Sequence, residues 1–431
     1  MIKKFNKIKY IYLVIKIFLL FFLLFSPKIN AKSKEMIRLM DLFENVFEKT
    51  HEEYVEEISE QELMEKAISG MLSALDPHSG YMNEETFKEM QVDTSGKFGG
   101  LGIQITMEEG FVKIISPIDD TPAYKAGLKA GDLITQINNK PVMGLNLKEA
   151  VDMMRGRPGT KIIITIAREG LDLFDVELKR EIIKIESVKN EIFDDIGYIR
   201  ISQFTEQTNK GLIKAVKETK ITLDNEELGY ILDLRSNPGG LLSQAVAVSD
   251  LFLNEGVIVS TKGRDINNDK KYSAKNGDII KNKPLVILIN GGSASASEIV
   301  AGALQDHKRA IVIGTKSFGK GSVQSIIPLW DFRRNNQGAM KLTTSRYYTP
   351  LGKSIQAKGI EPDIYVEQGE FKSNEISLYS ESDFFGSLDS SENLEIEEEI
   401  DENQKIFETD YQLSRAIDLV KALSILDQKE G

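Results

Sequence analysis

Four short apolar runs in the second half of the chain constrain the fold most strongly. Each run has the length of a buried strand, and the stretches between them repeat apolar residues at helical spacing. Strands that alternate with helices form a parallel or mixed sheet, because the helix carries the chain from the end of one strand to the start of the next. We therefore predict an α/β core with strands at residues 197–201, 230–234, 285–290 and 310–314.

The remainder of the 431-residue chain is too long for a single core. Residues 36–75 have helical periodicity, with a second helix starting after Ser59. Residues 98–184 contain short β-branched runs broken by Gly and Pro, which indicates a small β-rich domain.

Residues 267–283 are polar and are predicted to be a surface excursion. Residues 370–403 are rich in Ser and Glu, which is typical of partial disorder. An amphipathic helix over 411–426 is expected to dock on the core or on another subunit. The predicted regions are 1–31, 32–95, 96–184, 185–370 and 371–431.

Composition excludes several classes of function. The net charge is −12, whereas nucleic-acid binding requires a basic surface. The chain has no cysteine, so disulfides, thiolate metal sites, a cysteine nucleophile and a lipid-anchored cysteine are all excluded.

The first thirty residues have the pattern of a targeting segment. Lysines at positions 3, 4, 7 and 9 precede an apolar run over 10–25, interrupted only by Lys16, and Ala31 then ends a plausible cleavage site. A helix over 10–25 would rise about 24 Å, short of the roughly 30 Å hydrocarbon core of a bilayer. A cleaved signal peptide is therefore favoured over an uncleaved anchor. In both cases we expect the rest of the chain in the periplasm or on the outer face of the inner membrane.

A glycine-rich segment opens the small β-rich domain. Gly99, Gly100 and Gly102 precede an alternating strand, and such a backbone curl can turn its N–H groups toward a carboxylate. Together with the later Thr121-Pro122-Ala123 and Ala130-Gly131-Asp132 motifs, this region resembles a PDZ domain of the circularly permuted kind found in bacterial proteases. The resemblance implies that a peptide C-terminus adds as a strand beside the helix at 147–154, on Gly99, Gly100, Leu101, Gly102 and Ile103.

A serine-rich turn follows the third predicted strand. Ser293-Ala294-Ser295-Ala296-Ser297-Glu298 lies between that strand and an apolar helical pattern. A turn of this kind exposes a side chain beside the free N–H groups of the helix, and so can offer a nucleophile together with an oxyanion hole. The same residues also fit a helix cap at Ser293 or Ser295, with Glu298 completing a capping box. The two interpretations are compatible.

Several residues are candidates for the base that would activate the serine. His307 lies about 18 Å further along the same predicted helix and is out of reach. His51 is not part of a zinc-protease motif, while His78 stays open. Lys320, between Gly319 and Gly321, follows the next strand and should reach the same sheet edge as Ser295. Since a free lysine has a pKa near 10.4, desolvation would have to lower that pKa.

A nucleotide-binding alternative arises from the same segment. Residues 314–320 match the start of a phosphate-binding loop, but Gly321 replaces the Ser or Thr that would hold Mg²⁺. Nucleotide binding is therefore only a third hypothesis.

Five segments together resemble the carboxyl-terminal processing (tail-specific) serine proteases of bacteria and plastids: residues 75–81, 233–241, 293–298, 318–324 and 344–350. The resemblance implies a crotonase-like β/α protease core with an inserted PDZ domain, N-terminal helices and a C-terminal helical tail. It implies Ser295 as nucleophile, Lys320 as general base, and Gln324, one helical turn further on, as the group that orients the lysine. The oxyanion hole would be formed by the N–H of Ala296 with that of Gly239 or Gly240.

The resulting hypothesis is an exported serine endopeptidase that needs no cofactor or metal. Its substrates would be proteins with free C-termini that the PDZ domain recognises. The alternative is a non-catalytic PDZ adaptor that binds C-termini of exported proteins. A homo-oligomer and an adaptor partner both remain open.

Overall fold

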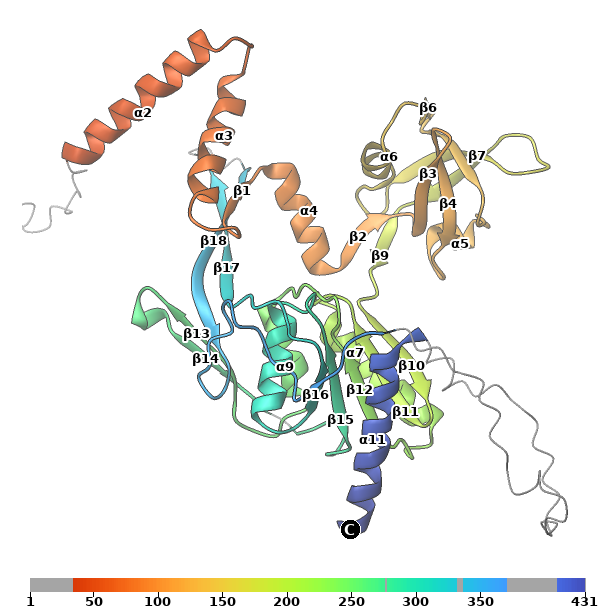
Figure 1. Ribbon diagram of the computed structural model, residues 1–431. Coiled ribbons are helices and arrows are strands. Elements are labelled where there is room, and N and C mark those ends of the chain that lie inside the picture. Colours follow the sequence, from red (N-terminus) through yellow and green to blue (C-terminus); the bar gives the residue numbers. More distant parts are fainter. Residues whose placement is uncertain (1–33, 276, 332–335, 370–408, 431) are drawn as a thin grey trace, which may run out of the picture. The chain divides into compact units, whose positions relative to one another are not determined.

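The computed structural model describes residues 34–275, 277–331, 336–369 and 409–430 (Figure 1). The predicted signal segment, 1–31, and the acidic segment, 370–403, lie outside these residues. Among the residues described, no helix combines the length and the apolar character needed to cross a bilayer.

The chain divides into two compact units, Met1–Ala74 and Leu75–Gly431. In the first unit, helix α2 spans Lys34–Glu53 and helix α3 spans Glu60–Ser73. The second helix begins where the sequence predicts, because the Ser59 side chain accepts a hydrogen bond from the Glu62 N–H at 3.1 Å and so caps it. No residue of α2 is buried.

The second unit starts with strand β1 (Gly80–Met82) and helix α4 (Glu84–Ser95), followed by the small β-rich domain. Its antiparallel sheet has the order β3-β4-β5-β7-β8, and β6 pairs with β5. Strand β2 (Lys97–Gly100) pairs with β9 (Glu181–Lys184), so the chain enters and leaves this domain through one two-stranded ribbon. The remaining bounds are β3 Ile103–Glu108, β4 Phe111–Pro117, α5 Pro122–Lys125, β5 Leu133–Ile137, β6 Lys140–Pro141, α6 Leu147–Met154, β7 Lys161–Ala167 and β8 Phe174–Lys179.

The α/β core is built on a six-stranded sheet. Its order is β10-β11-β12-β15-β16-β19, and all neighbours are parallel except β10 and β11. The four apolar runs predicted as strands correspond to β11, β12, β15 and β16. The bounds are β10 Val188–Phe193, β11 Ile196–Ile201, β12 Gly229–Asp233, β15 Leu285–Ile289, β16 Ile311–Gly314 and β19 Ile364–Tyr365.

Both faces of this sheet are covered by helices, which explains why its central strands β12 and β15 are buried at every position. Helices α7 (Thr208–Thr222), α8 (Leu242–Asp250) and α9 (Ala296–Asp306) pack on one face. Helix α11 (Tyr411–Glu430) covers the other face with Leu413, Ala416, Ile417 and Val420 (Figure 1). Of the two alternatives for the C-terminal helix, docking on the core is therefore the one observed.

A second sheet, with the order β1-β18-β13-β14, carries the segment that follows Lys320. Strand β17 (Ser322–Trp330) pairs with β18 (Asn336–Tyr348), and β13 (Val257–Gly263) pairs with both β18 and β14 (Lys270–Ser273). A short helix, η1, spans Ile266–Asn268. The polar segment 267–283, predicted as a surface excursion, includes strand β14, whose residues are mostly exposed. A polar segment can still form an edge strand, because one of its sides stays in water.

The parallel order of the core strands brings three loops together at one edge of the sheet. Strands β12, β15 and β16 are neighbours in the sheet and run in the same direction. The loops after their carboxyl ends, residues 234–240, 290–295 and 315–320, therefore meet at one edge. These are the three loops that carry the predicted catalytic motifs.

Candidate active site

Ser295 lies in a strained turn between β15 and α9. Its φ is 55° and its ψ is −110°, a conformation that costs a non-glycine residue about 1–3 kcal/mol. The surrounding structure enforces the turn: the Ala294 N–H donates to the Asn237 carbonyl at 3.0 Å, and the Ser293 hydroxyl donates to the Leu234 carbonyl at 2.8 Å. The backbone direction of Ser295 is therefore fixed by its neighbours.

Glu298 connects Ser295 to Lys320. The Glu298 side chain is fully buried, and its Oε2 accepts hydrogen bonds from the Ser295 N–H at 2.8 Å and the Lys320 N–H at 2.9 Å. Its Oε1 accepts from the Ser317 hydroxyl at 2.6 Å and the Gly319 N–H at 2.7 Å. The sequence indicated only a capping role for Glu298. In the structure the same carboxylate also holds the lysine loop against the start of α9.

Tyr347, from β18, makes a second connection between the two residues. Its hydroxyl donates to the Lys320 carbonyl and lies near the Ser295 side chain. Burial raises the pKa of Tyr347, so the phenol keeps its proton. Tyr347 belongs to one of the recognised motifs, but sequence reasoning gave it no role, because its partners lie far away in the chain.

Lys320 is half-buried, and its environment favours the neutral amine. Burial and the charge of Lys341 lower the pKa of Lys320, although Asp76 and Glu298 oppose the shift. His78 also lies near this amine: burial, Lys320 and Lys341 lower the pKa of His78. His307 is at the opposite end of α9, where its Nε2 contacts the Val257 carbonyl at 2.7 Å.

Gln324 follows Lys320 on a strand and not on a helix. It is on strand β17, so the expectation that it lies one helical turn after Lys320 was wrong. Pairing with β18 keeps the chain after Gly321 extended. The Gln324 Nε2 donates to the Ser322 hydroxyl at 3.0 Å and the Thr343 hydroxyl at 3.1 Å, and Thr343 in turn donates to Asp76 at 3.1 Å. Among the described residues, these hydrogen bonds link Gln324 to Asp76 rather than to Lys320.

The loop after β12 supplies the other side of the site. A Cβ on Gly239 would lie 2.7 Å from the Ser295 Cβ and 2.9 Å from the Ala296 nitrogen, so only glycine fits there. The Gly239 N–H donates to the Asn237 side chain at 2.9 Å. The N–H groups of Gly240 and Ala296, in contrast, have no hydrogen-bond partner within the described part of the chain. Of the two predicted glycines, Gly240 therefore has the available donor.

The nucleotide-binding alternative conflicts with the same contacts. A phosphate loop needs free backbone N–H groups, but those of Gly319 and Lys320 already bind the Glu298 carboxylate. A phosphate at this position would meet that negative charge.

The groove of the small β-rich domain lies where the resemblance implies. A cavity of about 110 Å³ is lined by Leu101, Ile103 and Ile105 on one side and by Val151 and Met154 of α6 on the other. Gly99 and Gly100 belong to β2, whereas the N–H groups of Leu101 and Gly102 have no partner among the described residues. Arg155, which the sequence did not single out, also lines the cavity, with its guanidinium 4.8 Å from the centre of the Phe98 ring.

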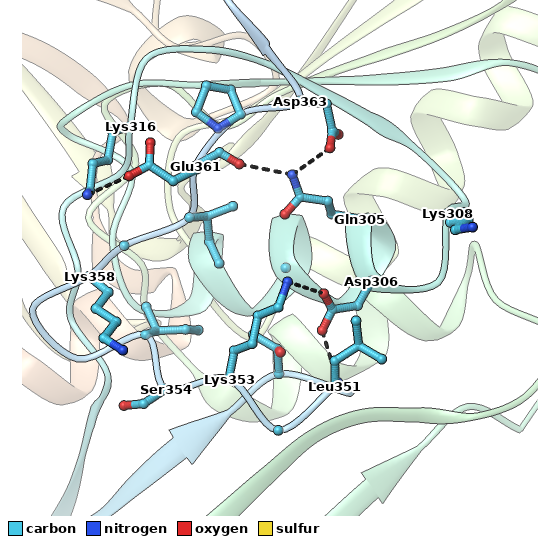
Figure 2. A pocket seen from close by; sticks show the side chains of 17 residues that line it. Gln305, Asp306, Lys308, Lys316, Leu351, Lys353, Ser354, Lys358, Glu361 and Asp363 are labelled. Atoms are coloured by element: carbon cyan, nitrogen blue, oxygen red, sulfur yellow. Dashed lines mark hydrogen bonds and ion pairs between the residues drawn. The ribbon is translucent and has the colours of Figure 1, made fainter.

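A larger pocket lies at the far end of α9 (Figure 2). It measures about 910 Å³ and includes Gln305 and Asp306, which end the helix that Ser295 precedes. Figure 2 shows that its polar groups largely bind one another: Gln305 donates to Asp363 at 3.0 Å, and Lys353 lies 3.6 Å from Asp306. Neither Ser295 nor Lys320 lines this pocket, so it is separate from the serine site.

Comparison with known families agrees with this architecture. Residues 195–366 match "Peptidase family S41", residues 113–168 match "PDZ domain", and residues 26–86 match "Activating protease CtpB N-terminal domain". These matches define a serine-type peptidase that carries a PDZ domain.

Curated relatives narrow the class further. The carboxy-terminal-processing protease of Bartonella bacilliformis is 52% identical over 360 residues, covering 82% of this chain and 81% of the relative. The carboxy-terminal processing protease CtpA of Bacillus subtilis is 37% identical, covering 74% and 67%. The chain therefore belongs to peptidase family S41, among the PDZ-containing carboxy-terminal processing serine proteases. The predicted α/β fold class is confirmed, and the non-catalytic adaptor is not favoured.

Among solved structures, the photosystem II D1 C-terminal processing protease is 28% identical, covers 75% of this chain and 86% of its own, and has a TM-score of 0.43.

We predict that Gly239→Ala removes most of the peptidase activity, because the new methyl group would displace Ser295 and Ala296. A loss of about 100-fold in kcat is expected, measured on a peptide substrate. Gly291→Ala is the matched control, since a Cβ there meets no atom within 4 Å. Equal kcat values for the two variants would contradict this account of the loop.

Proposed function

We propose that this chain is an exported endopeptidase that cuts proteins near their C-termini, with Ser295 as nucleophile and Lys320 as general base. The observation that carries the assignment is the shared carboxylate of Glu298, which binds the backbone of both residues. The Tyr347 hydroxyl, which donates to the Lys320 carbonyl and lies near the Ser295 side chain, supports the same pairing.

The proposed reaction uses only groups of this chain and water. The Ser295 hydroxyl attacks the scissile carbonyl while Lys320 takes its proton. The N–H groups of Ala296 and Gly240 stabilise the oxyanion, and Lys320 returns the proton to the leaving amine. A water molecule, activated in the same way, then releases the acyl group from Ser295.

The environment of Lys320 suits this role. A lysine accepts a proton only when neutral, and burial and Lys341 both lower its pKa. In this mechanism Gln324 has an indirect role. Its side chain donates a hydrogen bond to Thr343, and Thr343 donates to Asp76. The negative charge of Asp76 partly offsets the lowering of the Lys320 pKa.

The substrate chain has a path beside this site. A pocket of about 860 Å³ is bordered by Leu242, just after the oxyanion loop, and by Val323 and Thr343 from beyond Lys320. We assign it to the polypeptide on one side of the scissile bond.

The PDZ groove is proposed to receive the substrate's C-terminal residues. Leu101 and Gly102 offer N–H groups to the terminal carboxylate, and Arg155 adds a positive charge at the same cavity. Ile103 and Ile105 favour a small or apolar tail.

Residues 1–31 are proposed to direct export to the periplasm or to the outer face of the inner membrane. The lysines before the apolar run at 10–25 support this assignment. Processing of the full-length precursor to a form that starts after Ala31 would support a cleaved signal peptide rather than an uncleaved anchor. The chain has no cysteine, so a lipid anchor is not an alternative.

Ser295→Ala and Lys320→Ala should each abolish cleavage while the protein stays folded. The double variant should be no less active than either single variant, because the two groups act as one unit. Cleavage of an unfolded protein with an apolar tail, followed by gel electrophoresis and mass spectrometry, measures this. Full activity of Lys320→Ala would exclude lysine as the base, and a selective loss in His78→Ala would point to histidine instead.

Activity should rise with pH as Lys320 loses its proton. Because the charge of Lys341 lowers the pKa of Lys320, Lys341→Met should move the rising limb of the kcat profile to higher pH. Lys316→Met is the control, because Lys316 pairs with Glu361 on the surface and does not shift the pKa of Lys320. A profile that is identical in wild type and Lys341→Met would argue against Lys320 as the titrating base.

A substrate with a free apolar C-terminus should be cleaved faster than the same substrate amidated. Ile103→Asp should abolish this preference, because it places a negative charge in the groove. Leu101 is unsuited to the test, since it is 2% exposed and belongs to the domain core. Leu173→Asp, at a position 61% exposed, is the matched control. Equal rates on both tails in wild type would show that the groove does not recognise the carboxylate.

A further inference from the structure

Arg235 lies at the start of the loop that carries Gly239 and Gly240. It is 7% exposed, and its guanidinium contacts Asp233 at the end of β12: Nη2 donates to Asp233 Oδ2 at 2.7 Å and Nε donates to Oδ1 at 3.0 Å. The Arg235 N–H also donates to Asp233 Oδ1 at 2.8 Å. Both the backbone and the side chain of Arg235 are thus held where the strand ends.

The other side of the guanidinium is held by the C-terminal helix. Nη1 donates to Asp410 Oδ1 at 2.7 Å and Nη2 donates to Asp410 Oδ2 at 2.8 Å, a bidentate pair between residues 175 positions apart. Gln412 accepts a further hydrogen bond from Nη1 at 3.2 Å. Asp410 directly precedes α11, and its Oδ1 also caps the helix by accepting from the Leu413 N–H at 3.1 Å.

The loop after Arg235 depends on this anchor at its first residue. Ser236 has a φ of 55°, a strained value for a residue with a side chain, and its N–H donates to Asn290 at 2.8 Å. The Asn237 carbonyl accepts from the Ser297 hydroxyl at 2.9 Å, which fixes the middle of the loop to α9. Gly239 then lies against Ser295.

We propose that Asp410 is a positioning residue for the peptidase reaction: through Arg235 it holds the loop that places the Gly240 N–H at the oxyanion hole. Helix α11 is thereby part of the active-site support as well as a cover for the sheet. This inference rests on the proposed function, because it assumes that Gly240 and Ala296 bind the oxyanion formed at Ser295.

The physical argument is one of geometry and charge. A planar guanidinium between two carboxylates has a fixed orientation, and the backbone of the same residue starts the loop. Neutralising Asp410 removes one of the two negative charges that hold the guanidinium. Asp233 is then its only charged partner, and the orientation of Arg235 is no longer fixed from both sides. Displacement of an oxyanion donor by a fraction of an ångström affects the transition state more than substrate binding.

The test compares wild type, Asp410→Asn and Lys421→Ala as full-length chains. Asp410→Asn keeps an oxygen that can cap α11 but loses the charge. Lys421→Ala is the matched control, because Lys421 also joins α11 to the core, through Asp194 at 2.7 Å, but far along the helix from Arg235. Steady-state kinetics on a short peptide, corrected for the folded fraction, give kcat and KM separately.

We expect Asp410→Asn to lower kcat by about tenfold or more, with KM changed by less than about twofold. The pH of the rising limb should stay unchanged, because Lys320 is not in contact with Asp410. Lys421→Ala should keep the wild-type kcat. In an Arg235→Lys background, Asp410→Asn should cause little further loss, since its effect is transmitted by the guanidinium.

If Asp410→Asn fails to fold, Asp410→Glu provides the second variant: it keeps the charge, displaces the carboxylate by one methylene group, and should have an intermediate kcat with KM unchanged. A wild-type kcat in the folded Asp410 variant, or an equal loss in Lys421→Ala, would overturn the proposal. Ser295→Ala separates this failure from that of the proposed function: if it cleaves as fast as wild type, the proposed function fails, whereas an inactive Ser295→Ala with an active Asp410→Asn rejects only the positioning role.

Discussion

One buried carboxylate, that of Glu298, is the interaction on which the site depends. Burying a carboxylate is strongly unfavourable unless its oxygens are hydrogen bonded. Here both oxygens accept two hydrogen bonds each, and three of the four donors are in the loop that ends at Lys320. The fourth is the N–H of Ser295. A neutral amide at this position would turn one acceptor into a donor facing those N–H groups, so the charge itself joins the loop to the helix.

The sheet makes this short connection possible. Strands β12, β15 and β16 are adjacent and parallel, so the loops after them are neighbours although the sequence separates them. The carboxyl edge of a parallel sheet is the usual location of a site in α/β proteins. The second sheet then brings Tyr347 and Thr343 from β18 to the same edge, where they contact Lys320 and Asp76.

The sequence predicted those parts of the fold that depend on local pattern. The strands of the core were recognisable because burial on both faces makes them continuously apolar, as at 285–289. Gln324 was placed wrongly because strand pairing with β18, a long-range interaction, decides the conformation after Gly321. Asp410 was missed for a similar reason: its partner, Arg235, is distant in sequence. For Glu298 a local signal existed, but the capping box explained that signal completely and concealed the contacts with Gly319 and Lys320.

Two basic residues near the site have opposite environments, and the difference agrees with their proposed roles. Arg235 lies between the carboxylates of Asp233 and Asp410, whose hydrogen bonds outweigh the effect of burial and raise its pKa further. Lys320 instead has Lys341 near its amine, and burial lowers its pKa. A guanidinium that stays charged suits a fixed support, whereas an amine whose pKa is lowered by desolvation suits proton transfer. Placing the Glu298 carboxylate on the backbone of Lys320 rather than on its amine keeps the loop in place without an ion pair that would hold the proton.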